Sequence, residues 1–230
     1  MTTVHARLSL RREVARKALH LVFVVVPVAY ALGLPRGYLV AALAAGAIAA
    51  VAIELARAWH APTRERFVRW VGGLLREHEL VRWSGATWMV LSMLALALLA
   101  PRSVAVTAMW AISAGDAAAA LVGRAFERRG APEPTDVTHG SALAKRVELG
   151  GSMGAGGTAH TGSKTIRGSV ACLLVTFAGA LALAHLSVAE SVVAAVLATV
   201  AERPGGWVDD NVRIAAAVAV GILLWHIVFS

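Results

Sequence analysis

The 230-residue sequence has few charged side chains: they make up 16% of it, whereas 58% of the residues are hydrophobic and the mean hydropathy is +0.67. A soluble chain of this length needs more charge to cover its surface. The single cysteine, Cys172, excludes a disulfide framework. The basic residues do not line a polar, aromatic-rich face, which excludes a nucleic-acid-binding domain. The long unbroken apolar segments instead predict a polytopic integral membrane protein.

These segments predict an all-α transmembrane helix bundle of about seven spans, forming a single domain over residues 1–230. The spans are Leu19–Leu34, Tyr38–Leu55, Gly85–Ala100, Ser103–Val122, Gly168–Leu186, Ser187–Val200 and Val212–Phe229. The first span follows basic residues, as the core of a signal peptide would. We interpret it as a span, because the later spans need it for a consistent orientation.

Lysine and arginine alternate between the two sides of the predicted bundle. Most fall on one side: five in the tail up to Lys17, six in 57–84, seven in 124–167 and two in 203–213. The connections on the other side carry only Arg36 and Arg102. Because positive residues concentrate in cytoplasmic connections, we predict a cytoplasmic N-terminus in an inner or plasma membrane.

Two cytoplasmic connections are long, so we expect the functional site on that face. Residues 57–84 place Phe67 and Trp70 opposite arginines, which predicts an interfacial helix. Residues 125–167 form a predicted glycine-rich loop, in which backbone N–H groups and Lys164 could bind phosphate. A serine before Lys164 and the lack of a preceding strand exclude a Walker motif. A flexible linker is the structural alternative.

Asp116 lies deep in an apolar segment, eight residues before Arg124. On a helix this spacing places it about 12 Å beneath the cytoplasmic end. A carboxylate at that depth is costly unless it is paired, bound to a metal or in a wet cavity. The structural alternative to a functional acid is a buried ion pair with a basic residue of another span.

Acidic and amide side chains also mark the ends of three spans. Glu54 closes the second span and Glu202 the sixth, and each alone is interpreted as a solvated helix end. Asp209, Asp210 and Asn211 follow a Pro-Gly-Gly turn at the start of the seventh span. Their oxygen atoms suit Mg²⁺, which usually keeps waters and shares phosphate oxygens. Helix capping is the alternative for this turn.

The polar stretches occur along nearly the whole chain. In order they are Arg16-Lys17-Ala18-Leu19-His20, Arg76 to Glu79 with Gly85-Ala86-Thr87, Gly115-Asp116-Ala117-Ala118 with Val122-Gly123-Arg124, Ser163-Lys164-Thr165-Ile166-Arg167-Gly168-Ser169, and Glu202 with Asp209-Asp210-Asn211. Together they resemble the dolichol kinase and phytol kinase family of CTP-dependent lipid-alcohol kinases. The Asp-Asp-Asn turn is the most discriminating stretch, because the related CDP-diacylglycerol synthases are not expected to carry it in this form. Arg167 departs from the glutamate of the family, and the segment between Arg124 and Lys164 is longer than usual.

The resemblance implies phosphorylation of a membrane lipid alcohol of polyprenol, dolichol or phytol type at the cytoplasmic face. CTP would be the donor and Mg²⁺ the cofactor, and the products would be a lipid monophosphate and CDP. It implies catalytic roles for Asp116 and Lys164. The implied metal ligands are Asp116, Glu202, Asp209 and Asp210. The implied nucleotide contacts are Lys17, Arg124, Gly162, Ser163, Thr165 and Asn211.

Two other functions remain open from the sequence. The first is a CDP-lipid synthase that joins CTP to a phospholipid, like phosphatidate cytidylyltransferase. The second is a membrane transporter or non-catalytic scaffold, in which Asp116 would relay ions. The expected partners are a bilayer lipid alcohol and CTP, without nucleic acid, and a homodimer is compatible with the sequence.

Overall fold

The computed structural model describes residues 15–72, 79, 82–130, 165–203 and 208–229, without the side chains of 127–130. Most of these residues are helical and none of them lies in a strand, which confirms the predicted all-α class. After a helical stretch at 15–22 the elements are α2 (Val25–Ala31), α3 (Arg36–Trp59), α4 (Ala61–Val71), α5 (Gly85–Leu99), α6 (Arg102–Trp110), the π-helical turn η3 (Ala111–Gly115), α7 (Asp116–Gly130), α9 (Ile166–Ala182), α10 (Val188–Ala201) and α11 (Asp210–Phe229).

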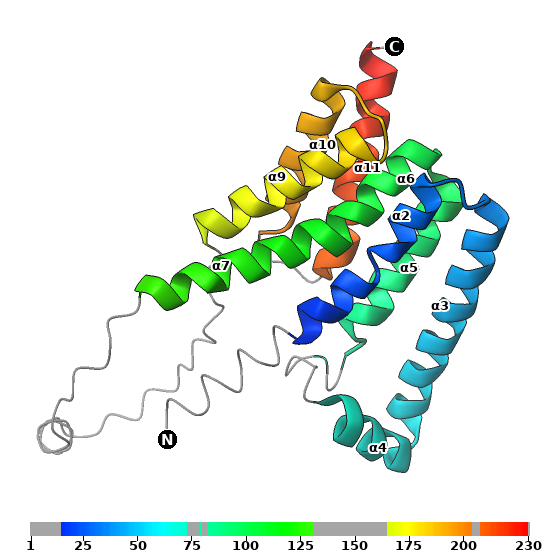
Figure 1. Cartoon of the computed structure of the whole chain (residues 1–230). Helices are drawn as coiled ribbons and strands as arrows, with labels where there is room; N and C mark the ends of the chain where they lie inside the picture. The colour runs from blue at the N-terminus through cyan, green and yellow to red at the C-terminus, as the bar shows by residue number, and fades with distance from the viewer. Residues whose placement is uncertain (1–14, 73–78, 80–81, 131–164, 204–207, 230) are drawn as a thin grey trace, which may run out of the picture.

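One continuous helix made of α6, η3 and α7 runs through the middle of the bundle (Figure 1). Its α6 part packs against α2, α5 and α11, and its η3 and α7 parts pack against α9. α10 lies between α9 and α11. α3 packs mainly on α5 and stands at the edge of the bundle, with α4 at its foot (Figure 1).

Three helices are long and apolar enough to cross a membrane: α3, the central helix over Arg102–Phe126, and α11. α5, α9 and α10 are also apolar, but they have only 15, 17 and 14 residues. At 1.5 Å per residue these lengths correspond to roughly 21–26 Å, less than a hydrocarbon core of about 30 Å. The apolar helices therefore fall into two groups, those long enough to cross a membrane and the shorter α5, α9 and α10.

The predicted first span is two helical pieces. The stretch 15–22 ends in a turn at Phe23 and Val24, and α2 begins at Val25. Pro27 explains the break, because it lacks an N–H and its ring clashes with the carbonyl four residues earlier, that of Phe23. This carbonyl instead accepts a hydrogen bond from Val26 N at 3.0 Å.

The two long connections are partly helical. α3 continues to Trp59, and an extended residue, His60, separates it from α4, so the helix predicted within 57–84 begins later and is shorter. The proline at the start of α4 favours a new helix at that point. α7 continues to Gly130 and α9 begins at Ile166, so the described ends of the predicted 125–167 loop are helical. The remainder of that loop, 131–164, lies outside the described residues.

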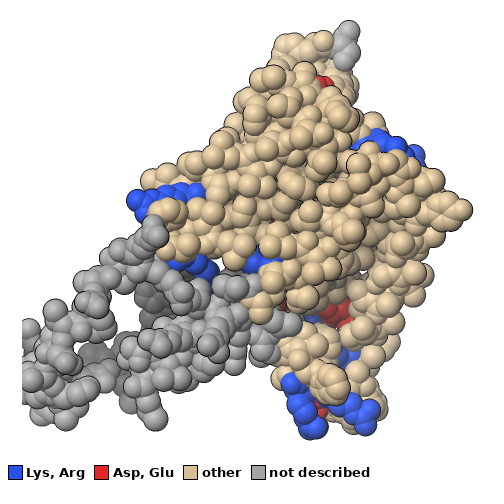
Figure 2. All heavy atoms as spheres, in the orientation of Figure 1, with Lys and Arg blue, Asp and Glu red and all other residues tan. Residues whose placement is uncertain are grey.

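The two ends of the bundle differ in polarity. We call "the polar end" the one at which the stretch 15–22 begins, α3 ends, and α5 and α11 begin. Arg36 and Arg102 lie together at the opposite end, where Arg36 Nε donates to the Ala97 carbonyl at 2.8 Å and Arg102 to the Leu34 carbonyl at 3.0 Å. Figure 2 shows Lys and Arg atoms along the left side and the bottom of the molecule, and a separate group at the upper right.

Candidate functional site

Asp116 follows η3 directly. π-Helical turns within α-helices are frequent at functional sites. Gly115, the last residue of η3, lies against α9: a Cβ atom there would be 2.6 Å from the hydroxyl oxygen of Thr176. The glycine therefore lets η3 and α9 approach closely, and it leaves Asp116 only 2% exposed.

Lys17 reaches the Asp116 carboxylate from the N-terminal stretch. Lys17 Nζ hydrogen-bonds to Asp116 Oδ2, and both side chains are almost fully buried. His20, one turn further along, places its Nδ1 atom 3.5 Å from the same oxygen. The structure thus contains the buried ion pair that was the alternative for Asp116. Lys17, predicted to contact phosphate, is the partner that makes this carboxylate tolerable in an apolar interior.

Asp210 brings a second acid to this pair. As the first residue of α11, it lies close enough to Asp116 and His20 to act on both electrostatically. The two carboxylates repel each other, and Lys17 offsets that repulsion. The N-terminal stretch, the central helix and α11 therefore meet through charged groups at the polar end.

The start of α11 also contacts the start of α5. Asp209 Oδ1 accepts hydrogen bonds from the backbone and side-chain nitrogens of Asn211, at 3.0 and 2.8 Å. The Asn211 amide donates in turn to the Gly85 carbonyl at 3.1 Å, and Gly85 N donates to Glu79 Oε1 at 2.9 Å. A Cβ on Gly85 would lie 3.1 Å from that Glu79 oxygen, so the cluster closes tightly around the glycine. The contact from Asp209 to Asn211 N is the capping interaction that was the alternative for this turn.

The four acids predicted to bind Mg²⁺ do not form one cluster. Within the described part of the chain, no three His, Cys, Asp or Glu side chains lie close enough together to hold a metal ion. Glu202 is buried at the end of α10, within electrostatic range of Cys172. Asn211 Oδ1, by contrast, is a buried oxygen without a hydrogen-bond partner among the described residues. Because Mg²⁺ needs only one or two carboxylates beside waters and phosphate oxygens, Asp209, Asp210 and Asn211 fit it.

Glu54 is the centre of a second hydrogen-bonded group at the polar end. Its Oε1 accepts from Ser84 N at 2.8 Å and from Thr87 Oγ1 at 2.9 Å, and its Oε2 pairs with Arg57. Glu54 is 2% exposed, so its interpretation as a solvated helix end is wrong. Donors from α3 and α5 compensate the carboxylate and permit its burial. Arg57 also donates to the Glu79 carbonyl at 2.8 Å, which joins this group to the one around Gly85.

The start of α9 packs directly on α7. Thr165 is the N-cap of α9, and its hydroxyl accepts from Gly168 N at 3.1 Å. A Cβ on Gly168 would be 2.6 Å from the Ala119 carbonyl, and one on Gly123 would be 2.9 Å from Thr165 Oγ1. The structure therefore gives the Thr165 hydroxyl, predicted to contact the nucleotide, a local capping role.

The other predicted nucleotide contacts are only partly described. Arg124 lies partly buried on α7, two turns beyond Asp116. Arg167, which departs from the family pattern, stacks over Phe126 with its guanidinium carbon 4.4 Å from the ring centre. Gly162, Ser163 and Lys164 lie outside the described residues.

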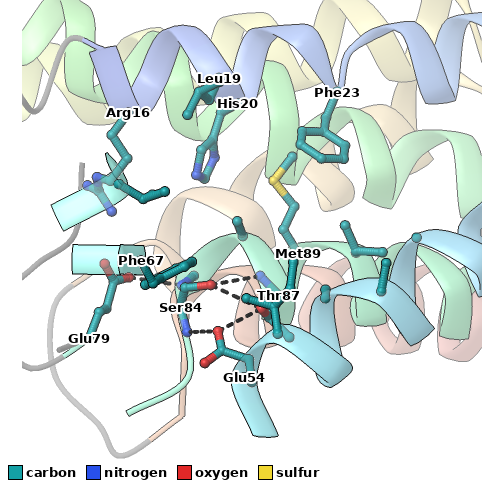
Figure 3. Close-up of a pocket in the computed structure, with 18 residues that line it drawn as sticks. Arg16, Leu19, His20, Phe23, Glu54, Phe67, Glu79, Ser84, Thr87 and Met89 are labelled. Carbon is teal, nitrogen blue, oxygen red and sulfur yellow. Dashed lines mark hydrogen bonds between the residues drawn. The ribbon is translucent and has the colours of Figure 1, made fainter. Parts of the chain in front are cut away.

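A cavity of about 390 Å³ adjoins these groups, between the stretch 15–22, α3, α4 and α5. In Figure 3, Arg16 and His20 line it from the N-terminal stretch, and Glu54 and Thr87 line it from the opposite side. The sequence did not predict a site role for His20, Glu54 or Thr87. The available signal was that polar residues stand at the same end of three separate apolar segments.

No protein-family model, curated protein or solved structure matches the chain.

Proposed function

We propose that the chain is an integral membrane enzyme that phosphorylates a lipid alcohol, of polyprenol, dolichol or phytol type, with CTP as donor. The observation that carries this proposal is that polar residues from distant motifs lie together in space. The motif stretches at 17–20, 79–87, 116 and 209–211 are far apart in the sequence, yet their polar groups meet at one end of the bundle. Ionisable residues inside apolar helices are expensive, and where they gather they mark substrate sites.

The residues have distinct proposed tasks. Asp209, Asp210 and Asn211 would hold Mg²⁺, which neutralises charge on the transferred phosphate. Lys164, Arg124 and the glycine-rich segment would bind the triphosphate. Asp116, positioned by Lys17, would orient the lipid hydroxyl. In the overall reaction the lipid oxygen bonds to the γ-phosphorus and its proton is released to solvent, while the bond from that phosphorus to the β-phosphate oxygen breaks and CDP leaves.

The proposal includes seven spans, with the polar end facing the cytoplasm. Arg36 and Arg102 at the opposite end support this orientation, because cytoplasmic connections are the ones enriched in Lys and Arg. The short helices α5, α9 and α10 pack against the longer α3, the continuous helix α6–η3–α7 and α11. A short hydrophobic helix can be accommodated in this way or by local thinning of the bilayer.

The test uses the purified protein in lipid nanodiscs, CTP labelled in its γ-phosphate, and a panel of lipid alcohols. We expect labelled lipid monophosphate and an equal amount of CDP, both dependent on Mg²⁺. Release of pyrophosphate with formation of a CDP-lipid would identify a cytidylyltransferase instead. Ion flux in proteoliposomes without turnover of CTP would identify a transporter.

A further inference from the structure

On three elements, the residues that line the cavity beside the site change from polar to apolar with distance from the polar end. Its polar lining residues stand nearest the polar end, and they are Arg16, His20, Glu54, Glu79, Ser84 and Thr87. On three of the lining elements apolar residues follow deeper, namely Phe23 on the N-terminal segment, Gly46 and Ala49 on α3, and Met89 on α5, while α4 adds Phe67 and Val71 near the polar end. Three separate elements therefore show the same gradient, which suits an amphipathic ligand with its head at the polar end.

His20 is the polar lining residue without a hydrogen bond among the described residues. It is only 6% exposed, and its Nδ1 atom lies 3.5 Å from Asp116 Oδ2, longer than an ordinary hydrogen bond. In Figure 3 its ring points from the stretch 15–22 into the cavity. Because a buried polar atom is costly when it lacks a partner, the ring indicates a ligand that can hydrogen-bond there.

One side of the cavity is open. Leu19 and Ile53, which line it from the N-terminal stretch and from α3, are 48% and 47% exposed. The α3 wall beside this opening is built from Gly46, Ala49 and Ala50, whose small side chains leave room for a chain to pass. The opening lies on the apolar flank of the bundle, where a bilayer would supply lipid.

We propose that this cavity is the acceptor site and that it takes a neutral lipid alcohol, with the hydroxyl beside His20 and the first part of the hydrocarbon chain along Gly46 and Ala49. This inference rests on the proposed function and names its substrate class. The rest of the chain leaves through the opening into the bilayer. The cavity therefore does not select for the total length of the lipid's hydrocarbon chain.

The charges at the polar end favour an alcohol over a phospholipid. Two carboxylates, Glu54 and Glu79, and one guanidinium, Arg16, line the head position, and Arg57 already pairs with Glu54. An anionic headgroup such as a phosphate monoester would meet these carboxylates at close range. A hydroxyl meets no such repulsion and can donate to the imidazole of His20. The same repulsion disfavours retention of the lipid monophosphate once it has formed.

The test is photolabelling in nanodiscs with a diazirine analogue of farnesol, without CTP, mapped by mass spectrometry. Label is expected on α3 around Gly46 to Ile53. Farnesol should compete, whereas farnesyl phosphate and the matching hydrocarbon should compete about ten-fold less well. Ala49→Trp fills the cavity and should reduce labelling about ten-fold. Ala52→Trp changes an exposed alanine of α3 that does not line the cavity, and should leave labelling unchanged.

Gly46→Val provides a second cavity-filling variant, and gel filtration checks that each variant is folded. In His20→Leu, farnesol should lose its advantage over the hydrocarbon. The inference is overturned if folded Ala49→Trp and Gly46→Val label like the wild type, or if farnesyl phosphate competes best. Hydroxyl-dependent labelling without any phosphorylation would instead overturn the kinase proposal and keep the lipid-alcohol site. Normal phosphorylation in a folded Ala49→Trp variant would overturn the acceptor site and keep the kinase.

Discussion

Lys17 and Asp116 each carry a charge that an apolar interior does not hold alone. The two residues are 99 positions apart, and each is buried because the other is present. Asp210 adds a further negative charge within electrostatic range of Asp116. At this position one lysine therefore compensates the charges of two carboxylates, and the His20 imidazole lies beside them.

Removing one member of the pair should be more damaging than removing both charges. Lys17→Met leaves Asp116 unpaired beside Asp210, and loss of one partner of a buried ion pair typically costs about 3–5 kcal/mol. Lys17→Met combined with Asp116→Asn should recover much of the lost stability while remaining inactive. Thermal midpoints in detergent measure the effect. A double variant as unstable as Lys17→Met alone would show that the two side chains are not energetically coupled.

The Asp209–Asn211 turn should control the demand for Mg²⁺. Asp209→Asn removes a charge but keeps an oxygen that can accept from the Asn211 nitrogens, so the local fold should survive. The Mg²⁺ concentration for half-maximal activity should rise by at least about ten-fold. The matched control is Glu190→Gln, an acid at the start of α10 that caps its helix through Ser187. An unchanged Mg²⁺ requirement in Asp209→Asn would restrict this turn to helix capping.

At the scale of the helices, glycines determine how closely neighbouring helices approach each other. η3 meets α9 at Gly115, and α7 meets the start of α9 at Gly123 and Gly168. These contacts fix the wall behind Asp116 and the place where the glycine-rich segment rejoins the bundle. The positions of Asp116 and Thr165 relative to each other therefore depend on contacts that only a small residue allows.

The Gly115 contact can be tested by a rescue experiment. Gly115→Ala would place a Cβ 2.6 Å from the Thr176 hydroxyl oxygen, and such overpacking typically costs about 1–3 kcal/mol. Thr176→Ala removes that oxygen, and the nearest remaining atom, Cys172 Sγ, would then be 3.6 Å away. The double variant should regain the wild-type melting temperature. Failure of the rescue would mean that the backbone around η3, and not this contact, limits the approach.

Substitutions of the adjacent residues Lys164 and Thr165, just before α9, should affect activity and stability separately. Thr165→Ala removes the N-cap of α9 and should lower stability by about 1 kcal/mol, with Thr165→Ser close to the wild type. Lys164→Ala should abolish most activity without a change in melting temperature, because its predicted role is to bind phosphate. Paired measurements of the melting temperature and of CTP turnover distinguish the two. A melting temperature lowered equally by both changes would assign Lys164 to structure.

At the scale of the whole molecule, the orientation of the chain in the membrane is the prediction that is easiest to test. Gly37 and Ala58 stand near opposite ends of α3, separated by 21 residues or about 32 Å, enough to span the hydrocarbon core. In a Cys172→Ala background, Gly37→Cys should react with an impermeant thiol reagent outside intact cells. Ala58→Cys and Gly140→Cys should react only after permeabilisation. Labelling of Gly140→Cys from outside would overturn the proposed topology.

The sequence was sufficient for the helical class, because apolar segments separated by charged stretches predict membrane helices directly. It also identified Asp116, because a carboxylate in such a segment has a recognisable cost. It could not name Lys17 as the partner, since that contact is long-range. The burial of Glu54 was missed for the same reason: two of its three donor groups, Ser84 N and the Thr87 hydroxyl, come from another helix. Interactions between elements, and not the elements themselves, are what the sequence left open.

The long-range pair between Lys17 and Asp116 has a consequence for how the protein is made. The ribosome completes Lys17 well before Asp116, and at roughly 5–20 residues per second the 99 residues between them take about 5–20 s. During this interval Lys17 has no counter-charge in the bilayer, so its ammonium group must stay at the aqueous surface. The stretch 15–22 can therefore dock on the central helix only after the segment that carries Asp116 has been made. Docking of this stretch is thus a late step in the assembly of the bundle, although Lys17 is made early.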